Sequence, residues 1–389
     1  MPVINVAGRA GTVLSIQPVA ELGGSDQALL RLARQLAGAG WAVHVALPAA
    51  SPMASDFQQA GATLHTVPMQ RISTSHGLAA WAAYAARWPV SVWRLHRLAR
   101  AVGADVVHSN SLHSWYGWAV ALLSGKPHIW HAREIVTQSG AALRVERFLA
   151  RHFACRVIAA SSAVAGQLHP GNVTVVHEEP DGTEFSPGRA GRLRQRVGLP
   201  DASPLVGYVG RIDTWKGIDV LFDALPLLAA RRPQAQAVVA GGTVAGKEGY
   251  AHQLAARASE LGVRWLGALG GPEAADLIAD LDCLAYPSTS PEPWGLAIVE
   301  ALACGTPVVA TDAGGPREIL AGLPPEAGAL VPPGDPAALA GALERLLPAR
   351  TSTELRRGRP SLRSGRPAAY AQLFSEVVEA CRAGRPGRR

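Results

Sequence analysis

Short apolar runs alternate with longer amphipathic segments along most of the chain, a pattern typical of strands followed by helices. The apolar run 12–19 precedes a glycine-rich turn and residues 27–40, which place Leu29 and Leu32 on one helical face and end on glycine. Strand-like runs in this half of the chain lie at 12–19, 41–48, 104–110, 127–132 and 156–161. This spacing predicts parallel strands with crossover helices in a doubly wound α/β domain.

The same alternation restarts after a Pro- and Gly-rich stretch at 178–188. Further strand-like runs, separated by helical patterns, lie at 204–210, 235–242, 263–267, 283–288 and 306–312. We expect a first domain at 1–180, completed by an amphipathic helix at about 368–384, and a second α/β domain at 190–350. Two such domains in series predict a cleft between the carboxyl ends of two parallel sheets, where ligands usually bind.

Composition agrees with two folded domains, because 389 residues exceed one ordinary core and 48% apolar residues exclude disorder. The net charge of +7 is divided unevenly along the chain. Residues 1–180 carry 14 Lys and Arg against 8 Asp and Glu, whereas residues 181–349 carry 13 against 19. This division does not favour a nucleic-acid-binding protein. The basic first half indicates either ordinary solvated charge or an anionic acceptor or membrane surface.

Cysteine spacing and hydropathy indicate in which cellular compartment the protein is expected. The four cysteines form no CxxC pair, which argues against a disulfide framework or a zinc site. The first 22 residues lack the order of charge, apolar run and cleavage site of a signal peptide, and no apolar stretch of 18 residues occurs. The sequence therefore predicts a cytoplasmic protein without a metal site or cofactor.

The segment 290–320 carries two glutamates, Glu292 and Glu300, with seven residues between them. A helix is expected to begin near Gly295, so the two carboxylates are separated by up to about 12 Å. At that distance they do not share a proton, and they suit two ends of one elongated ligand. Glu300 could accept from a vicinal diol such as ribose, and Glu292 from hydroxyls at the other end. The alternative is an ordinary amphipathic helix that carries two glutamates.

Phosphate-binding groups are expected next to these glutamates. The backbone N–H groups from Trp294 to Leu296 would face a diphosphate at the start of the helix. In the segment 207–225, Arg211 and Lys216 follow a strand and precede a helix. An Arg fork and a Lys point charge suit a pyrophosphate leaving group when no metal is present. The alternative is a pair of solvated loop cations.

The segments GRIDTWKG and EPWGLAIVEALACGTPVVATDAGGPREI resemble the donor-binding motifs of glycosyltransferase family 4, whose members are retaining enzymes of the GT-B fold. Residues 21–45 and 328–343 are similar to that family's glycine loop and its C-terminal proline-glycine segment. The resemblance implies that Glu300 holds the ribose and Glu292 the hydroxyls of the donor sugar. It also implies that Arg211 and Lys216 bind the diphosphate.

The resemblance assigns further donor contacts to residues of both domains. It implies that the backbone at Gly24 approaches a phosphate or sugar, and that main-chain groups of Gly267 and Leu269 grip the base. His131, at the end of a predicted strand, resembles the family's active-site histidine, which contacts the donor sugar and helps orient the reacting centre. A histidine at such a position can equally be a hydrogen-bonded core residue.

Candidate acceptor contacts are Arg71 in a loop, Asn110 at a strand end, and Arg133 and Glu134 directly after His131. The segment 76–103 mixes tryptophan with arginine, at Trp81, Arg87, Trp88, Trp93, Arg94, Arg97 and Arg100. Such a helix suits peripheral contact with anionic lipid or a pocket for a hydrophobic acceptor. It is equally compatible with tryptophans packed inward and arginines in water.

The sequence therefore predicts an α/β protein of GT-B fold that acts as a retaining glycosyltransferase. It would transfer a hexose-type sugar from a UDP- or GDP-sugar to the hydroxyl of a lipid, glycan or natural product, without a divalent metal. By resemblance, attack is front-face, and the leaving phosphate oxygen takes the acceptor proton. The alternatives are a nucleotide-sugar 2-epimerase of the same fold and a donor-binding partner without turnover.

Overall fold

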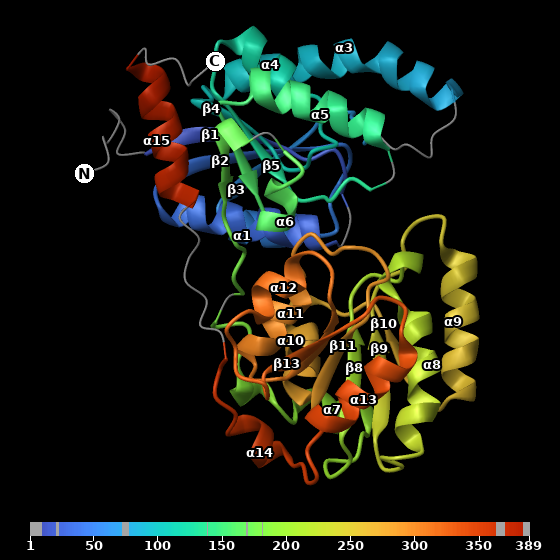
Figure 1. The fold of residues 1–389 in the computed structure, drawn as a ribbon. Helices are drawn as coiled ribbons and strands as arrows, with labels where there is room; N and C mark the ends of the chain where they lie inside the picture. Colours follow the sequence, from blue (N-terminus) through green and yellow to red (C-terminus); the bar gives the residue numbers. More distant parts are fainter. Residues whose placement is uncertain are drawn as a thin grey trace. The chain divides into compact units, whose positions relative to one another are not determined.

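The computed structural model divides the chain into two units, residues 1–177 with 367–389 and residues 178–366 (Figure 1). It describes residues 10–20, 23–71, 78–137, 139–168, 170–180, 182–362 and 370–383. Parts of the predicted glycine turn, of the Trp/Arg segment and of the last helix fall outside these ranges.

The first unit is built on a seven-stranded parallel sheet of order β3-β2-β1-β4-β5-β6-β7. Its strands are β1 (Gly11–Ile16), β2 (Trp41–Leu47), β3 (Ala62–Thr66), β4 (Val106–Ser109), β5 (His128–Ala132), β6 (Arg156–Ala159) and β7 (Val173–Val175). Its helices are α1 (Gly24–Gly38), α2 (Ala54–Gln59), α3 (Leu78–Ala101), α4 (Gly117–Ser124), α5 (Gly140–Phe153), α6 (Ser162–Ala165) and α15 (Tyr370–Arg382), with a 3₁₀ turn at Pro170–Asn172.

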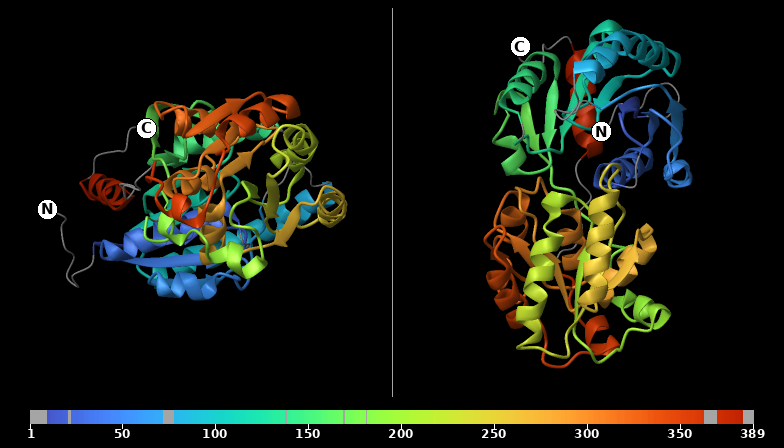
Figure 2. Two further views of the ribbon diagram at one scale, coloured as in Figure 1. Left: turned by 90° about the horizontal axis from the view of Figure 1, so that it is seen from below. Right: turned by 90° about the vertical axis from the view of Figure 1, so that its right-hand side faces the viewer.

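Helices cover both faces of this sheet, because both faces of a parallel sheet must be buried. Successive strand residues point to opposite faces, so Val13 packs with α1, α2 and α15 while Leu14 packs with α3 and α4. α15 joins this unit from the far end of the chain (Figure 2). Its Phe374 ring meets Trp41 edge-on at 5.9 Å, and its Arg382 pairs with Asp105 at 2.7 Å.

The second unit has a six-stranded parallel sheet of order β10-β9-β8-β11-β12-β13. Its strands are β8 (Leu205–Val209), β9 (Gln236–Ala240), β10 (Arg264–Gly267), β11 (Cys283–Tyr286), β12 (Val308–Thr311) and β13 (Gly328–Val331). Its helices are α7 (Arg192–Val197), α8 (Ile218–Ala229), α9 (Glu248–Glu260), α10 (Gly271–Asp280), α11 (Leu296–Ala303), α12 (Gly315–Leu320), α13 (Pro336–Leu346) and α14 (Thr353–Arg357), with 3₁₀ turns at Pro187–Arg189 and Thr214–Lys216.

In this sheet, α8, α9 and α13 pack on one face, and α10, α11 and α12 line up beside one another (Figure 1). The unit also extends past 350, where the sequence predicts the end of the domain, and takes in α14. The physical reason is Arg356, which is fully buried and donates to the carboxylates of Asp282 and Asp201. The predicted fold class, two doubly wound α/β domains, is confirmed.

No described helix is long and apolar enough to cross a membrane.

Candidate functional site

A buried ion pair lies at the carboxyl ends of β8 and β11 in the second unit. Lys216 Nζ donates to Glu292 Oε2 at 2.7 Å and to the Tyr286 hydroxyl at 3.0 Å, and Ser288 Oγ donates to the same carboxylate oxygen at 3.1 Å. The side chains of Lys216 and Glu292 are only 7% and 9% exposed. The ammonium also lies 4.1 Å from the centre of the Trp215 ring. Within the described residues, two of its three N–H groups are thus occupied by hydrogen bonds.

Two glycines allow the loops around this pair to approach each other. Gly217, with φ 70°, directly follows Lys216, and a Cβ there would lie 1.9 Å from the carbonyl oxygen of Pro287. Gly314, with φ 78°, lies against Glu292, where a Cβ would be 2.2 Å from the Glu292 carbonyl oxygen. Residues with a Cβ avoid both the left-handed conformation and such contacts. These glycines therefore hold Lys216 and Glu292 within ion-pair distance.

Several neighbouring charges act on one another at this site. Burial lowers the pKa of Lys216, and the neighbouring Glu292 opposes that effect. Burial, followed by the Glu292 charge, raises the pKa of Tyr286 well above its ordinary value. Arg211 is half-buried and contributes to lowering the pKa of Lys216, yet within the described residues its guanidinium has no hydrogen-bond or ion-pair partner. Asp213 acts on the pKa of Lys216 in the opposite direction to Arg211, so two further charges of opposite sign lie near the ion pair.

The loop that carries Glu292 leads into the start of α11. Gly295 adopts a left-handed conformation as the N-cap, and Leu296 is the first helical residue, as the sequence predicts. The indole of Trp294 donates to the Glu178 carbonyl at 2.8 Å, which fixes this loop to the first residue of the unit. Glu300 is half-buried and lies one helical turn beyond Leu296, about 6 Å along the axis.

The proposed base contacts lie further away on the same sheet edge. Gly267 ends β10, which is two strands from β8, or about 10 Å in a parallel sheet. Its carbonyl accepts from the Gly241 N–H at 2.7 Å, and Leu269 follows in the next loop, half-buried. The structure therefore brings Lys216 and Glu292 into contact and places Gly267 and Leu269 apart from them.

In the first unit, a chain of hydrogen bonds links His131 to the start of α1. His131 lies inside β5, fully buried, and its Nδ1 is 3.1 Å from Arg133 Nη2. Arg133 Nε donates to Asn110 Oδ1 at 3.0 Å, Asn110 Nδ2 to Gln17 Oε1 at 3.1 Å, and Gln17 Nε2 to Asp26 Oδ1 at 3.3 Å. Neither Gln17 nor Asp26 is among the site residues that the sequence predicts. Their only sequence indication is a polar residue at a strand end and an acidic residue in the first turn of a helix.

Two other predicted acceptor contacts, Glu134 and Arg71, have different surroundings. The Glu134 carboxylate accepts from Ser111 Oγ at 2.5 Å and from the Leu112 N–H at 3.0 Å, so it joins the ends of β4 and β5. Arg71 is exposed, and its charge acts on His113. Burial lowers the pKa of His113 and the Arg71 charge adds to this, but the hydrogen bond to Glu146 and the nearby carboxylates outweigh both effects and raise that pKa overall. Arg71 is thus close to a histidine that tends to carry charge.

Burial also keeps two histidines of this region neutral. It lowers the pKa of His108 and His131 well below the ordinary value, and the positive charge of Arg133 adds to the effect in both cases. The two rings are 5.8 Å apart, and α15 covers them with Tyr370 and Phe374 at 5.6 Å each. Gly24, the first residue of α1, is exposed near the other end of the hydrogen-bond chain.

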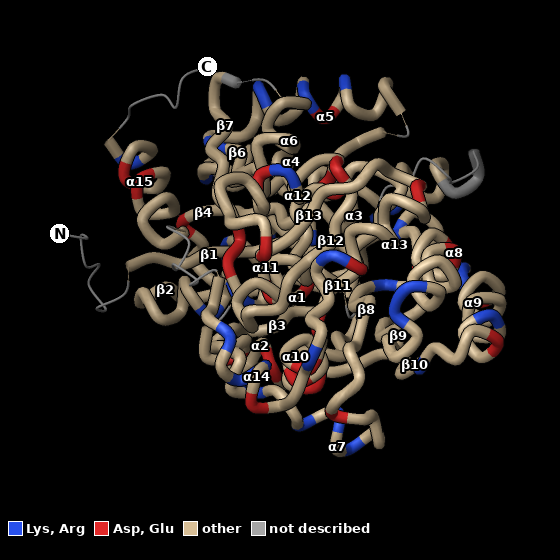
Figure 3. Tube along the Cα trace, turned by 60° about the horizontal axis from the view of Figure 1, so that its bottom comes forward, with Lys and Arg blue, Asp and Glu red and all other residues tan. Residues whose placement is uncertain are grey.

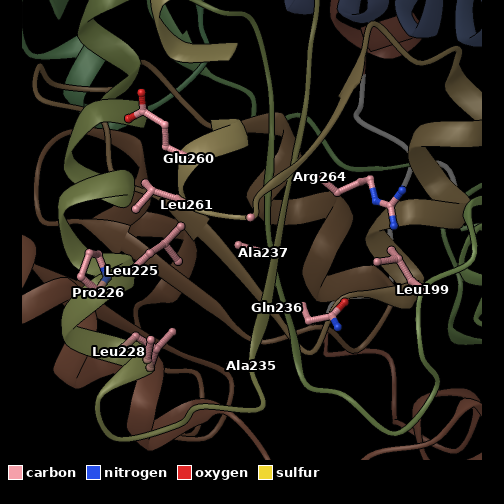
Figure 4. A pocket seen from close by; sticks show the side chains of 12 residues that line it. Leu199, Leu225, Pro226, Leu228, Ala235, Gln236, Ala237, Glu260, Leu261 and Arg264 are labelled. Carbon is pink, nitrogen blue, oxygen red and sulfur yellow. The ribbon is translucent and has the colours of Figure 1, made fainter. Parts of the chain in front are cut away.

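A cavity of roughly 500 Å³ in the second unit is separate from these groups (Figure 4). It is lined mainly by aliphatic side chains, among them Leu225 and Leu228 of α8. Gln236 and Arg264 border it, and they are the first residues of β9 and β10. It therefore lies at the amino edge of the sheet, opposite to Lys216. Within the described residues, no group of three or more His, Cys, Asp or Glu could hold a metal ion.

Two family models match the chain, "Glycosyl transferases group 1" at residues 190–358 and "Glycosyl transferase 4-like domain" at residues 23–177. A D-inositol 3-phosphate glycosyltransferase of Stackebrandtia nassauensis is 31% identical over 337 residues, which span 76% of this chain and 72% of that protein. The corresponding protein of Mycolicibacterium gilvum is 37% identical over 189 residues, 47% of this chain and 41% of that protein.

Solved structures also resemble the chain over nearly its whole length. Anabaena Alr3699/HepE in complex with UDP and glucose has a TM-score of 0.74 at 25% identity, covering 95% of this chain and all of that one. WaaG, a glycosyltransferase involved in lipopolysaccharide biosynthesis, has a TM-score of 0.64 at 17% identity, covering 94% of this chain and 99% of that one. The second likeness concerns the fold alone.

Proposed function

Because this chain belongs to the family-4 type of GT-B glycosyltransferases, we propose that it transfers a hexose-type sugar from a nucleoside diphosphate sugar to an acceptor hydroxyl with retention. The observation that carries the proposal is the buried Lys216–Glu292 pair beside the unpaired Arg211. Arg211 and the third N–H of Lys216 would bind the diphosphate, and Glu292 would accept from hydroxyls of the sugar. Glu300 would hold the ribose.

In the proposed reaction, the bond between the anomeric carbon and the diphosphate oxygen breaks as the acceptor oxygen bonds to that carbon from the same face. The acceptor proton goes to the leaving phosphate oxygen, so no protein base is needed. Arg211 and Lys216 stabilise the negative charge that develops on the diphosphate, in a site where burial strengthens each charge–charge interaction. We expect no requirement for a divalent metal, and full activity in EDTA would support this.

Of the two donor bases that the sequence leaves open, we propose uracil. HepE, the 25% identical relative, was solved with UDP, which favours a UDP-sugar over a GDP-sugar. A thermal-shift panel tests this, since a ligand raises the melting temperature according to its affinity. UDP should raise it at concentrations at which GDP does not. Arg211→Ala should abolish the shift, whereas Arg264→Ala, at the opposite edge of the same sheet, should retain it.

Transfer itself separates the proposal from its alternatives. Labelled UDP-sugar with an acceptor should give a glycoside that keeps the anomeric configuration of the donor. A donor sugar altered at C2 without an acceptor would instead show a 2-epimerase. Nucleotide binding without turnover with any acceptor would show a donor-binding partner.

For the acceptor we propose an anionic polyol. The curated relatives are named for D-inositol 3-phosphate, a phosphorylated cyclitol, and residues 1–180 of this chain carry a net positive charge. Arg71, exposed and close to His113, is the residue we propose for the anionic group. Phosphorylated inositol should be a better acceptor than inositol, and Arg71→Ala should raise the acceptor KM without changing the donor KM. Equal use of both acceptors would refute the anionic preference.

We also propose that the first unit contacts an anionic lipid surface through the outer side of α3, α4 and α5. α4 packs between the other two, because its Trp118 lies 5.8 Å from Trp88 of α3 and 4.8 Å from Phe153 of α5. Six of the ten large apolar side chains most exposed among the described residues belong to these helices: Val90, Trp93, Leu122, Leu123, Val145 and Phe148. We call this set the α3–α5 face.

Charge on the same helices favours a lipid surface over a protein partner of mixed charge. Their exposed charged residues are all arginines: Arg87, Arg94, Arg97, Arg100, Arg144, Arg147 and Arg151. Figure 3 shows the basic positions along α5. The one acidic residue of these helices, Glu146, is buried against His113. Each arginine near an anionic leaflet contributes about 1 kcal/mol, and the apolar side chains can enter the headgroup region.

Sedimentation with vesicles tests the contact. The protein should bind vesicles of phosphatidylglycerol but not of phosphatidylcholine, and less at high salt. Serine at Trp93, Leu123 and Phe148 should weaken binding, whereas serine at Leu227 and Leu355, which are also exposed but lie in the second unit, should not. Equal sedimentation with both lipids, or no effect of the first set, would refute the proposal.

A further inference from the structure

The hydrogen bond between Arg133 and His131 determines where the imidazole carries its proton. A guanidinium has five N–H donors and no acceptor, so it can only donate to a ring nitrogen. Arg133 Nη2 lies 3.1 Å from His131 Nδ1, and this nitrogen must therefore be the unprotonated one. We infer that Arg133 is a positioning residue that holds His131 as the neutral imidazole with its proton on Nε2.

Arg133 is itself oriented by the hydrogen-bond chain that runs to α1. The Asp26 carboxylate accepts from Gln17 Nε2, which turns Gln17 Oε1 toward Asn110 Nδ2 and leaves Asn110 Oδ1 to accept from Arg133 Nε. Every bond of this chain donates in the same direction, from Arg133 to Asp26. Gln17, Asn110 and Asp26 are all at most 1% exposed, so water does not replace these contacts. The orientation of two amides thus fixes the guanidinium.

The neutral state of the ring follows from the groups that surround it. The groups that face it include His108 from β4, Arg133 from the loop after β5, and Tyr370 from α15. Burial disfavours the imidazolium, and the charge of Arg133 adds to this. A second proton on His131 would also have to occupy Nδ1 and break the bond from Arg133.

This inference rests on the proposed function for its consequence, which concerns the role of the histidine. With its proton on Nε2, His131 donates one hydrogen bond from that atom and cannot take a proton there. It would act as a hydrogen-bond donor from that atom and would not act as a base there. This agrees with the proposed transfer of the acceptor proton to the leaving phosphate oxygen. Arg133, expected from sequence to meet the acceptor, instead acts through His131.

The tautomer is measured by ¹⁵N NMR of the full chain labelled at its histidines, without any substrate. The His131 signals are assigned by their loss in His131→Gln. We expect a protonated Nε2 and an unprotonated Nδ1 at neutral pH. A protonated Nδ1 in the wild-type protein would overturn the inference, and this result does not depend on any variant folding.

Two variants test whether Arg133 is the cause. Arg133→Met should give Nδ1–H or a mixture of tautomers, whereas Arg156→Met, which removes a similar charge from the neighbouring β6, should leave His131 unchanged. An unchanged tautomer in Arg133→Met would refute the role. In kinetics, we expect kcat to fall about tenfold, the value of one hydrogen bond, with the donor KM nearly constant.

The pH profile gives a readout that a purely structural role would not change. Removing the Arg133 charge should move the acid limb of kcat to higher pH, because His131 then protonates more easily. A profile that stays in place would contradict the inference. If wild-type protein shows no transfer at all, the proposed function fails, but the tautomer measurement still decides the role of Arg133.

Discussion

Removal of one partner of the Lys216–Glu292 pair should destabilise the second unit far more than removal of both. Lys216→Met leaves a carboxylate less than a tenth exposed, with the Ser288 hydroxyl as its remaining side-chain donor. Glu292→Gln leaves a buried ammonium without its paired carboxylate. An uncompensated buried charge typically costs about 3–5 kcal/mol.

The structure gives the size of the expected coupling. At 2.7 Å and an effective dielectric constant of about 20, the attraction between the two charges is about 6 kcal/mol. Desolvation of the two ions, at several kcal/mol each, offsets most of this gain. The double variant, which carries neither charge of the pair, should therefore lie within about 2 kcal/mol of wild type. The coupling between the two substitutions should exceed about 2 kcal/mol.

Urea unfolding of the four proteins at pH 7.5, followed by tryptophan fluorescence and fitted with a separate transition for each unit, measures this cycle. Arg231→Met is the matched control, since its 2.9 Å bond to Glu344 is also an ion pair but is 58% and 36% exposed. It should cost less than about 1 kcal/mol. Additive effects of Lys216→Met and Glu292→Gln would refute the view that these charges depend on each other.

Other predictions concern acid stability, backbone strain and thiol reactivity. His128 has a pKa of about 3 in the folded chain, lowered by burial from 6.5, so the unfolded state binds more protons between these values. The contribution of His128 to the free energy of unfolding is therefore constant above pH 6.5 and falls by about 1.4 kcal/mol per pH unit below it. In urea titrations at pH 7.5 and 5, His128→Asn should show a smaller loss of stability than wild type. Gly217→Ala should lower the free energy of unfolding by more than about 2 kcal/mol, because the new Cβ would meet a backbone carbonyl. Gly198→Ala, also at positive φ but in open space, should lower it by only about 1 kcal/mol. Equal losses in the two variants would contradict the contact. Ellman's reagent should modify the exposed Cys155 and Cys381 in the folded protein and all four thiols after denaturation. The reason is that burial raises the pKa of Cys283 and Cys304 to about 12. Rapid reaction of all four thiols in the folded protein would contradict this burial.

The sequence predicts the class of fold because the strands in the middle of each sheet are continuous apolar runs. Edge strands are harder to recognise: β3 and β7 are half-exposed, and their side chains alternate with polar residues. β13, also at an edge, opens the segment 328–343, which the sequence indicates only through the proline-glycine turn that follows the strand. Periodicity fails where a strand has little core to cover.

The candidate site shows the same division between local and long-range information. The glycine and charge patterns around Lys216 and Glu292 indicate a phosphate site, but the two residues are 76 positions apart and their ion pair depends on how β8 and β11 are paired. The spacing of the two residues along the chain does not determine the distance between their side chains. Likewise, the bond from Arg133 to His131 depends on rotamers that Asn110 imposes from another strand.

The position of α15 sets an order of events during synthesis. The first unit needs residues 370–382 to cover Trp41 and the ring of His131, yet the ribosome makes the whole second unit before them. At 5–20 residues per second, the roughly 190 residues between take about 10–40 s. During that interval the nascent first unit would expose an apolar strip that a chaperone can bind. The histidine environment would be completed last, so the two units would mature in the reverse of their order in the chain.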